Sequence, residues 1–282
     1  MLVGKGAQRG GGDNGAFLSV IATAVLAGML WLPGALLNGF PSLAGHAEGL
    51  GWFALSGLLT IILGRSFFYA SIAKLGAIRA SAVSRLTPFF SAGLAALLLN
   101  EAVTPLGAVG MTLIGLGFAL LVSGMLRDGA RRHAAAPSGP AGYIFGPVSS
   151  LCYASGLVAR KLGLLDLPDA SLGTFVGAAT ALAVSLALAL VSARHRSAVT
   201  GLVTSTTRWH VFSALTISIG QLSQFKAIQL IEVSRVAMIN TSEVAFTLIL
   251  STWVLRTERR PTAVTLLAAL LAAGGAVLIA VG

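Results

Sequence analysis

The chain has 282 residues, of which 56% are hydrophobic and 10% are charged, and its formal net charge is +10. A soluble domain carries about 25% charged residues, so this composition excludes a water-exposed surface over much of the chain and makes lipid its solvent. Nucleic-acid binding is excluded as well, because the basic residues form short clusters between apolar runs, as loops at a membrane surface do. The single cysteine, Cys152, excludes a disulfide framework within the chain. The histidines lack the spacing of metal ligands, so no metal or other cofactor is expected.

Apolar runs predict nine membrane-spanning helices, because about 20 apolar residues are needed to cross the hydrocarbon. The predicted spans are residues 16–39, 50–73, 77–99, 105–126, 142–160, 171–192, 209–230, 235–256 and 262–281. A helix satisfies its backbone donors and acceptors within the segment, and the long continuous runs exclude alternating barrel strands. The expected fold class is therefore an all-α integral membrane protein.

An internal repeat is visible when the chain is shifted by 157 positions without gaps. Glu101 then falls on Glu258, and this match carries most weight because charges are rare in the chain and both glutamates occupy the same kind of turn. Further matches are Phe68 with Phe225, Ala70 with Ala227, Ala80 with Ala237 and Gly117 with Gly274. The predicted organisation is a first repeat of four spans at 1–127, a cytoplasmic linker at 128–141 and a second repeat of five spans at 142–282.

The two repeats predict an inverted arrangement, since an odd number of spans per repeat turns the second copy upside down. Inverted repeats recur in transporters, with the substrate site near the midplane between the copies. Met1 falls opposite Val158, so the first copy lacks a counterpart of the span 142–160. We expect that the first span of a ten-helix protein is missing here. A natural nine-span protein is the alternative, and the upstream coding sequence would decide between them.

The basic residues are distributed unequally between the two sides of this topology. Most of the 19 Lys and Arg lie on the side of the N-terminus, with clusters at 127–132, 194–196 and 256–260. Because cytoplasmic loops carry an excess of Lys and Arg, this bias predicts a cytoplasmic N-terminal side and a chain that ends outside.

Residues 67–121 resemble the EamA domain of the drug/metabolite transporter superfamily. The similar features are the aromatic patch at 67–70, Pro88, Glu101, Gly110, Leu113, Ile114 and Gly117. The second copy, 224–281, is a weaker match, with Ala245 at the place of the proline and Leu267 at that of the first glycine. The order and the duplication of these features carry the resemblance.

The resemblance implies a ten-helix carrier of two inverted five-helix repeats. Such carriers export amino acids, metabolites or drugs across the bacterial cytoplasmic (inner) membrane. Ten-span members usually keep both ends in the cytoplasm. Restoring a first span here, under the charge bias, would instead place both ends outside, so the two lines of reasoning disagree on topology.

Two charged residues near the middle of predicted spans are the leading site candidates, Arg85 in 77–99 and Glu243 in 235–256. A charge at that depth costs about 2.5–3.5 kcal/mol on insertion scales, so it usually faces the bundle interior. The two spans are repeat equivalents, and the resemblance places both around a central cavity. The pair is expected to bind the carboxylate and amine of a solute. Alternatively, Glu243 is a proton site, or the pair is an interhelical ion pair.

Other polar residues share these helical faces or line neighbouring spans. The further binding candidates are Asn240, Ser84, Arg65, Tyr69, Gln221 and Gln224. Structural hydrogen bonding between helices is the alternative for the amides and hydroxyls. Pro88 is expected to be a gating hinge or a shape-setting bend. Arg160 and Lys161 are interpreted as interfacial anchors at the end of a span.

The leading functional hypothesis is a secondary transporter that exports small amino-acid-like or drug-like solutes by alternating access. The sequence shows no nucleophile–base arrangement and no phosphate-binding loop, so it predicts neither an enzyme nor an ATP-driven pump. The expected partners are a small-molecule solute, protons or another coupling solute, and the lipid bilayer, with the chain a monomer or homodimer. A channel, a non-transporting membrane sensor and an intramembrane enzyme are the competing hypotheses.

Overall fold

The computed structural model describes residues 14–39, 45–75, 80, 86–102, 104–132, 142–192, 196 and 206–240, together with 264, 267, 270–271, 274–275 and 277–279. Regular structure within this part of the chain is helical, so the predicted all-α membrane class is confirmed. Three of the described helical stretches are long and apolar enough to cross a membrane. They are Phe17–Leu37, Ala47–Lys74 and Ala170–Val191.

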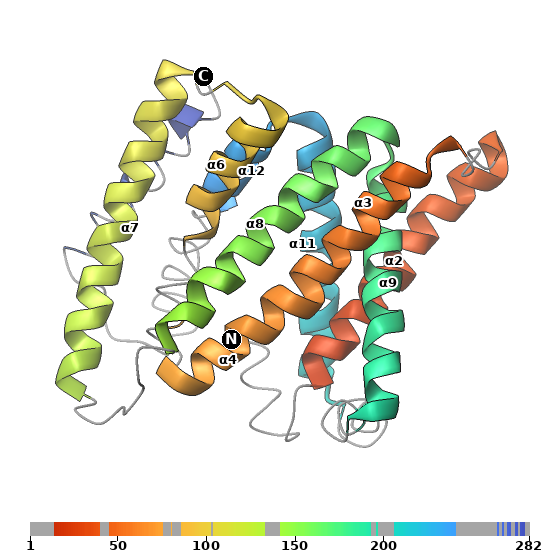
Figure 1. The fold of residues 1–282 in the computed structure, drawn as a ribbon, viewed down its shortest axis with the longest axis horizontal. Helices are drawn as coiled ribbons and strands as arrows, with labels where there is room; N and C mark the ends of the chain where they lie inside the picture. The colour runs from red at the N-terminus through yellow and green to blue at the C-terminus, as the bar shows by residue number, and fades with distance from the viewer. Residues whose placement is uncertain are drawn as a thin grey trace. The chain divides into compact units, whose positions relative to one another are not determined.

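The helices follow the predicted spans closely in chain order (Figure 1). They are α2 (Asn14–Asn38), α3 (Ala47–Gly57), the π-helix η2 (Leu58–Gly64), α4 (Arg65–Leu75), α6 (Thr87–Leu99), α7 (Pro105–Arg132), α8 (Gly142–Asp166), α9 (Ala170–Val191), α11 (Arg208–Leu230) and α12 (Val233–Asn240). Two helices continue past their predicted ends: α7 runs beyond residue 126 to Arg132, and α8 runs beyond residue 160 to Asp166. Helix α8 stops only before Pro168, where Asp169 caps α9 by accepting hydrogen bonds from the backbone of Ser171 and Leu172.

The helices group into two compact units. Unit 1 comprises residues 1–62 and 159–230, and unit 2 comprises residues 63–158 and 231–282. Each unit therefore takes segments from both sequence repeats.

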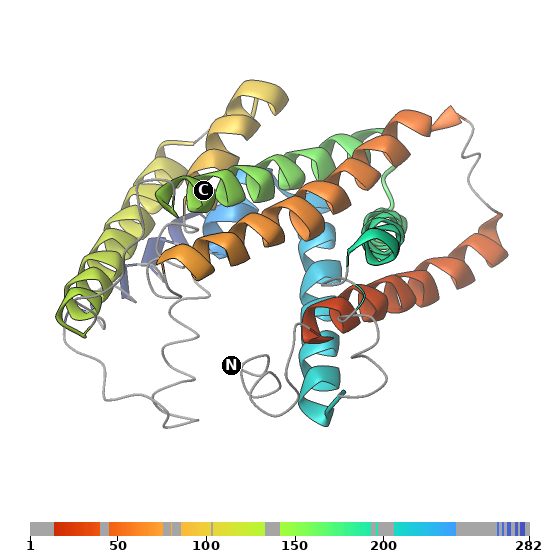
Figure 2. The ribbon, with the colours of Figure 1, turned by 60° about the horizontal axis from the view of Figure 1, so that its bottom comes forward.

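Unit 1 is held together by close contacts at small residues. Helix α2 packs against α9 and α11, and α3 packs against α9 (Figures 1 and 2). At the α3–α9 crossing, a Cβ atom added to Gly57 would lie 2.1 Å from the carbonyl oxygen of Gly177. Small residues at such crossings let the two backbones approach, which is how helices associate where lipid removes the hydrophobic drive.

A phenylalanine fills the space that other glycines leave open in unit 1. Phe53 of α3 is completely buried, and it lies edge-on to Phe225 of α11 with 6.1 Å between the ring centroids. A Cβ atom at Gly163 or at Gly173 would come within 2.6 or 2.7 Å of the Phe53 ring. The glycines of α8 and α9 therefore make room for this ring, and they fix where α3 meets α8 and α9.

Unit 2 uses the same kind of packing. A Cβ atom added to Gly110 of α7 would lie 2.6 Å from the carbonyl oxygen of Gly275, and one added to Gly275 would lie 2.5 Å from that of Gly110. Beside this crossing, Ile114, Met238 and Ile279 form a buried apolar cluster. The N-terminal segment of α12 packs against α6 in the same unit.

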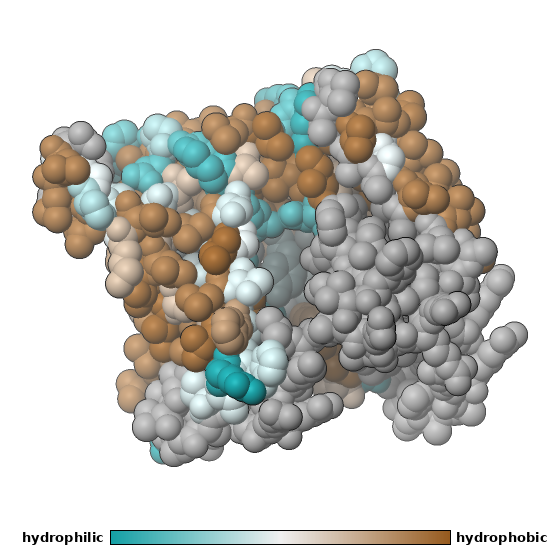
Figure 3. All heavy atoms as spheres, turned by 180° about the vertical axis from the view of Figure 1, so that it is seen from behind, coloured by the Kyte–Doolittle hydropathy of each residue, from teal (hydrophilic) through white to brown (hydrophobic). Residues whose placement is uncertain are grey.

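Large apolar side chains cover much of the outer surface, as Figure 3 shows for one face. Leu37 at the end of α2 and Val191 at the end of α9 are each 86% exposed, and Leu36 and Leu190 beside them are exposed too. Exposed apolar patches of this size are not compatible with water. These surfaces are explained by contact with lipid, as expected for a multi-pass membrane protein.

Candidate functional site

A buried arginine lies among polar side chains in the described part of unit 1. Arg160 lies within α8, one turn and a half before its end, and its residue is only 2% exposed. The prediction that Arg160 is an interfacial anchor at a helix end is therefore wrong. The reason is that the apolar segment after it, residues 162–165, continues the helix. The neighbouring Lys161 is half-buried, and its Nζ donates to the carbonyl oxygen of Ile228 at 2.9 Å, near the C-terminus of α11.

Side chains of the continuous segment α3–η2 and of α11 surround the Arg160 guanidinium. Nε donates to Ser56 Oγ of α3 at 3.1 Å, and Nη2 donates to Thr60 Oγ1 of η2 at 3.4 Å. From α11, Gln221 Oε1 accepts from Nη2 at 3.0 Å and Gln224 Oε1 accepts from Nη1 at 2.5 Å. We call these five residues the arginine cluster. It joins α3–η2, α8 and α11 through a single side chain.

The arginine cluster explains how a guanidinium is tolerated at this depth. Burying a charge is costly unless its donors are satisfied, and here hydroxyl and amide oxygens accept hydrogen bonds from it. The face of Phe225 lies 4.6 Å from Cζ, which adds a cation–π contact. Thr60 is part of a π-helix, a rare element that is found frequently at functional sites.

A stripe of polar residues on α11 continues from this cluster towards α2. Ser218 is fully buried, and its Oγ accepts a hydrogen bond from Thr23 Oγ1 at 2.9 Å. Ser218 Oγ also donates to the carbonyl oxygen of Ala214 at 2.8 Å. The stripe on α11 therefore runs from a contact with α2 to a contact with α8, and it faces the inside of unit 1.

The other predicted binding residues are placed as follows. Arg85, Ser84 and Glu243 lie outside the described residues, so their pairing stays a prediction. Asn240 is the last residue of α12 and is exposed, whereas Arg65 and Tyr69 are half-buried on α4 in unit 2. The structure thus brings Gln221 and Gln224 together around an arginine that was not among the predicted binding residues.

Pro88 lies in the first turn of α6, which begins at Thr87. In the first turn a missing N–H costs nothing, because the first backbone donors of a helix have no partner within it. The described segment therefore gives no mid-helix kink at this position, and a gating role for Pro88 stays a prediction.

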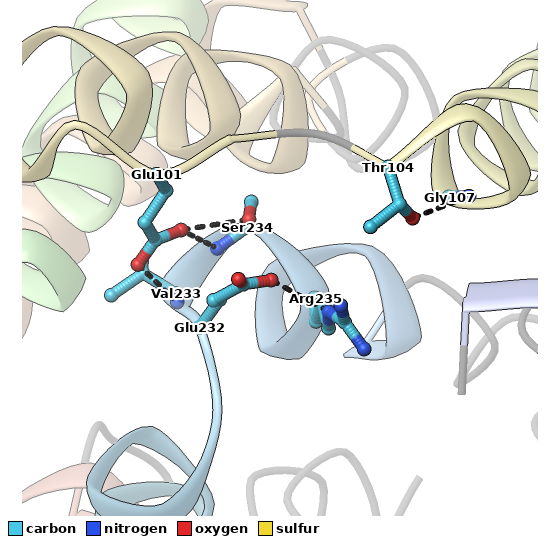
Figure 4. Close-up of polar contacts among 7 residues, drawn as sticks. All are labelled: Glu101, Thr104, Gly107, Glu232, Val233, Ser234 and Arg235. Atoms are coloured by element: carbon cyan, nitrogen blue, oxygen red, sulfur yellow. Dashed lines mark hydrogen bonds and ion pairs between the residues drawn. The ribbon is translucent and has the colours of Figure 1, made fainter. Parts of the chain in front are cut away.

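Glu101 caps the N-terminus of α12 (Figure 4). Its Oε1 accepts from the backbone N–H of Val233 at 2.7 Å, and its Oε2 accepts from the N–H and the Oγ of Ser234 at 3.0 and 2.7 Å. A carboxylate at this end satisfies orphan donors and complements the helix dipole. Glu101 thus pairs across 132 positions of the chain, and its repeat equivalent Glu258 lies outside the described residues.

Asp166 caps the N-terminus of α3. It lies at the end of α8, beyond the predicted span 142–160. Its Oδ2 accepts from the backbone N–H of Gly49 at 2.8 Å, and its Oδ1 lies 3.1 Å from Nδ1 of His46. The side-chain hydrogen bond with His46, followed by the backbone bond from Gly49, lowers the pKa of this carboxyl below its ordinary value of 3.8.

Replacing Asp166 by asparagine is expected to lower the thermal midpoint at neutral pH, and the difference from the wild type is expected to vanish in acid. A carboxyl whose folded pKa is depressed stabilises the fold above its unfolded pKa, and this contribution is lost as the pH falls through the folded value. Thermal unfolding of both proteins from about pH 7 down to about pH 3 tests this. A difference in thermal midpoint between the two proteins that persists unchanged at the lowest pH would contradict the capping role.

Apolar helices with lipid-facing surfaces, a repeated sequence and an enclosed polar cluster define a multi-pass membrane protein of the transporter class. The model of the EamA-like transporter family matches the chain twice, at residues 8–123 and 140–281. The chain belongs to the EamA-like transporter family, and the resemblance seen in the sequence, including its duplication into inverted repeats, is confirmed.

One solved structure, titled only "Crystal structure of protein", is similar over 99% of this chain and 92% of its own. The TM-score is 0.66 and the sequence identity is 16%, so the likeness supports the fold alone. No curated protein matches the chain.

Proposed function

We propose that the chain is a secondary transporter, and not an enzyme, that exports small amino-acid-like or drug-like solutes across the bacterial cytoplasmic membrane by alternating access. The observation that carries the proposal is the arginine cluster. Charged side chains within membrane helices are rare and usually mark a solute or ion pathway. Here one is surrounded by polar side chains of unit 1.

The origin of the cluster in the sequence supports the same function. Ser56 and Thr60 come from the first repeat, whereas Arg160 and both glutamines come from the second. Substrate sites of carriers built from inverted repeats lie where the two copies meet. Because the cluster takes its members from both copies, its hydrogen bonds would rearrange when the packing of the two copies changes during transport.

The energy source is proposed to be an ion or solute gradient, with Glu243 as the candidate proton site and Arg85 as its partner. Asn240, Ser84, Arg65 and Tyr69 remain candidates for contacts with the solute. The transport unit is proposed to be a monomer or homodimer.

The direct test is a counterflow assay with the purified chain in proteoliposomes and a panel of amino acids, metabolites and cationic drugs. Saturable exchange of at least one solute is expected. Glu243→Gln is expected to abolish concentrative flux driven by a proton gradient, while Glu48→Gln on the exposed start of α3 leaves it unchanged. Non-saturable flux would indicate a channel instead, and absence of flux for every solute would contradict transport.

A further inference from the structure

The two glutamines of the arginine cluster have a fixed orientation. The guanidinium of arginine carries only donors, so any amide atom that bonds to it must be the oxygen. Gln221 and Gln224 both bond to Arg160 through Oε1. Each amide NH2 group is therefore turned away from Arg160. The contact with arginine thus leaves the NH2 end of each amide, and not the oxygen end, to bind another partner.

These NH2 groups differ from that of the next glutamine on the same helix. Gln229 uses both ends of its amide, since Oε1 accepts from Lys226 Nζ at 2.8 Å and Nε2 donates to the carbonyl oxygen of Pro168 at 2.6 Å. Among the described residues, no hydrogen bond involves Nε2 of Gln221 or Gln224. Neither nitrogen is among the buried side-chain atoms without a partner in the described residues, which are the hydroxyl oxygens of Ser71 and Ser91.

The spacing of the two amides suits a ligand with two acceptor atoms. Gln221 and Gln224 are three residues apart on α11, so they lie on the same face of the helix. Their NH2 groups provide donors one turn apart, next to the positive charge of Arg160. Because Arg160 is buried, such donors and a fixed charge act more strongly on an anion than they would in water.

We propose that the NH2 groups of Gln221 and Gln224 bind the two oxygens of a carboxylate on the transported solute. Arg160 is a positioning residue in this site, because it sets the orientation of both amides and supplies the charge behind them. Ser56 and Thr60 in turn hold the guanidinium from the side of α3–η2. This inference rests on the proposed transport function and specifies the group of the solute that unit 1 recognises.

The test compares solutes that differ only in the proposed group. Matched acids and amides, namely L-leucine with L-leucinamide and benzoate with benzamide, are measured as thermal shifts of the purified full chain and as competitors in counterflow. The wild type is expected to prefer the acid of a pair by about tenfold, as one charged hydrogen bond would give. Gln221→Met and Gln224→Met keep the side-chain size, and each is expected to raise the KM of the acid several-fold with little change in maximal rate.

Arg160→Lys tests the positioning role, because a single ammonium keeps the charge but cannot hold both amides as the guanidinium does. It is expected to reduce the acid-over-amide preference by about tenfold, and a circular-dichroism spectrum like that of the wild type shows that it folds. Gln229→Met is the matched control, since that amide is engaged elsewhere, and it is expected to keep both KM and preference.

The outcomes separate the two proposals. If the wild type exchanges solutes but treats acid and amide alike, or if all three cluster variants keep the preference of the wild type, the carboxylate site is wrong and the transport function stands. If the wild type exchanges no solute in the panel, the transport function itself fails.

Discussion

Replacing Gly57 by alanine is expected to lower the thermal midpoint of the protein in detergent by several degrees, the largest loss of stability among the single-methyl changes considered. The new Cβ atom would lie 2.1 Å from the carbonyl oxygen of Gly177 and 2.7 Å from its carbonyl carbon. These are backbone atoms of α9, so no side chain can rotate away and the two helices must move apart. Overpacking of this kind costs about 1–3 kcal/mol or more.

Gly51→Ala on the same helix is the matched control. Open space surrounds the position where its Cβ atom would lie, and alanine stabilises a helix by about 0.5–1 kcal/mol relative to glycine. The control is therefore expected to unfold at the same temperature as the wild type or slightly above it. Equal losses in the two variants would show that α3 and α9 do not cross at Gly57 and Gly177.

Replacing Glu101 by glutamine is the second change with a large expected effect. A neutral amide keeps one acceptor oxygen but places a donor against the N–H and hydroxyl donors at the start of α12. Loss of the charge and of part of the cap is expected to cost about 2–3 kcal/mol of unfolding free energy. Titration with a denaturing detergent measures this cost, and hydrogen exchange of the Val233 and Ser234 amides should accelerate because their acceptor is the group that changes.

Glu48→Gln is the control for this substitution, because Glu48 is exposed on α3 and its carboxylate accepts from Trp52 Nε1 at 3.2 Å. Its loss is expected to stay within about 0.5 kcal/mol, as for most surface changes. Unchanged hydrogen exchange at Val233 and Ser234 in Glu101→Gln would argue against the cap even if the global stability fell.

The helices were largely predictable from the sequence because the membrane imposes a length on each apolar run. The expected spans at 16–39 and 171–192 correspond to α2 and α9 with small shifts at the ends, and the span at 105–126 corresponds to α7, which continues to Arg132. The contact that Glu101 makes was not predicted, although the repeat analysis placed this residue in a turn. Its partner helix, α12, could not be identified because periodicity carries no information on contacts 132 residues apart.

The arginine cluster could be predicted only in part. Gln221 and Gln224 were predicted as binding candidates, and their spacing of three residues puts them on one helical face. Arg160 was misplaced because two adjacent basic residues resemble the end of a span, and the apolar residues 162–165 after them were counted as part of a loop. The Pro168–Asp169 pair was the better signal for the end of α8, since a proline and an N-cap residue together mark a helix boundary.

The π-helix η2 has a consequence for how the chain tolerates changes of length. A single-turn π-bulge contains one residue more than an α-helix needs for the same path. Loss of one residue among 61–64 would let the segment relax into an ordinary α-helix, with the flanking faces of α3 and α4 nearly in their original directions. A deletion elsewhere in 47–75 would turn one end of the helix by about 100° relative to the other. A variant that lacks one residue of this segment would therefore keep the glycine contacts of α3 and change mainly how Thr60 meets Arg160.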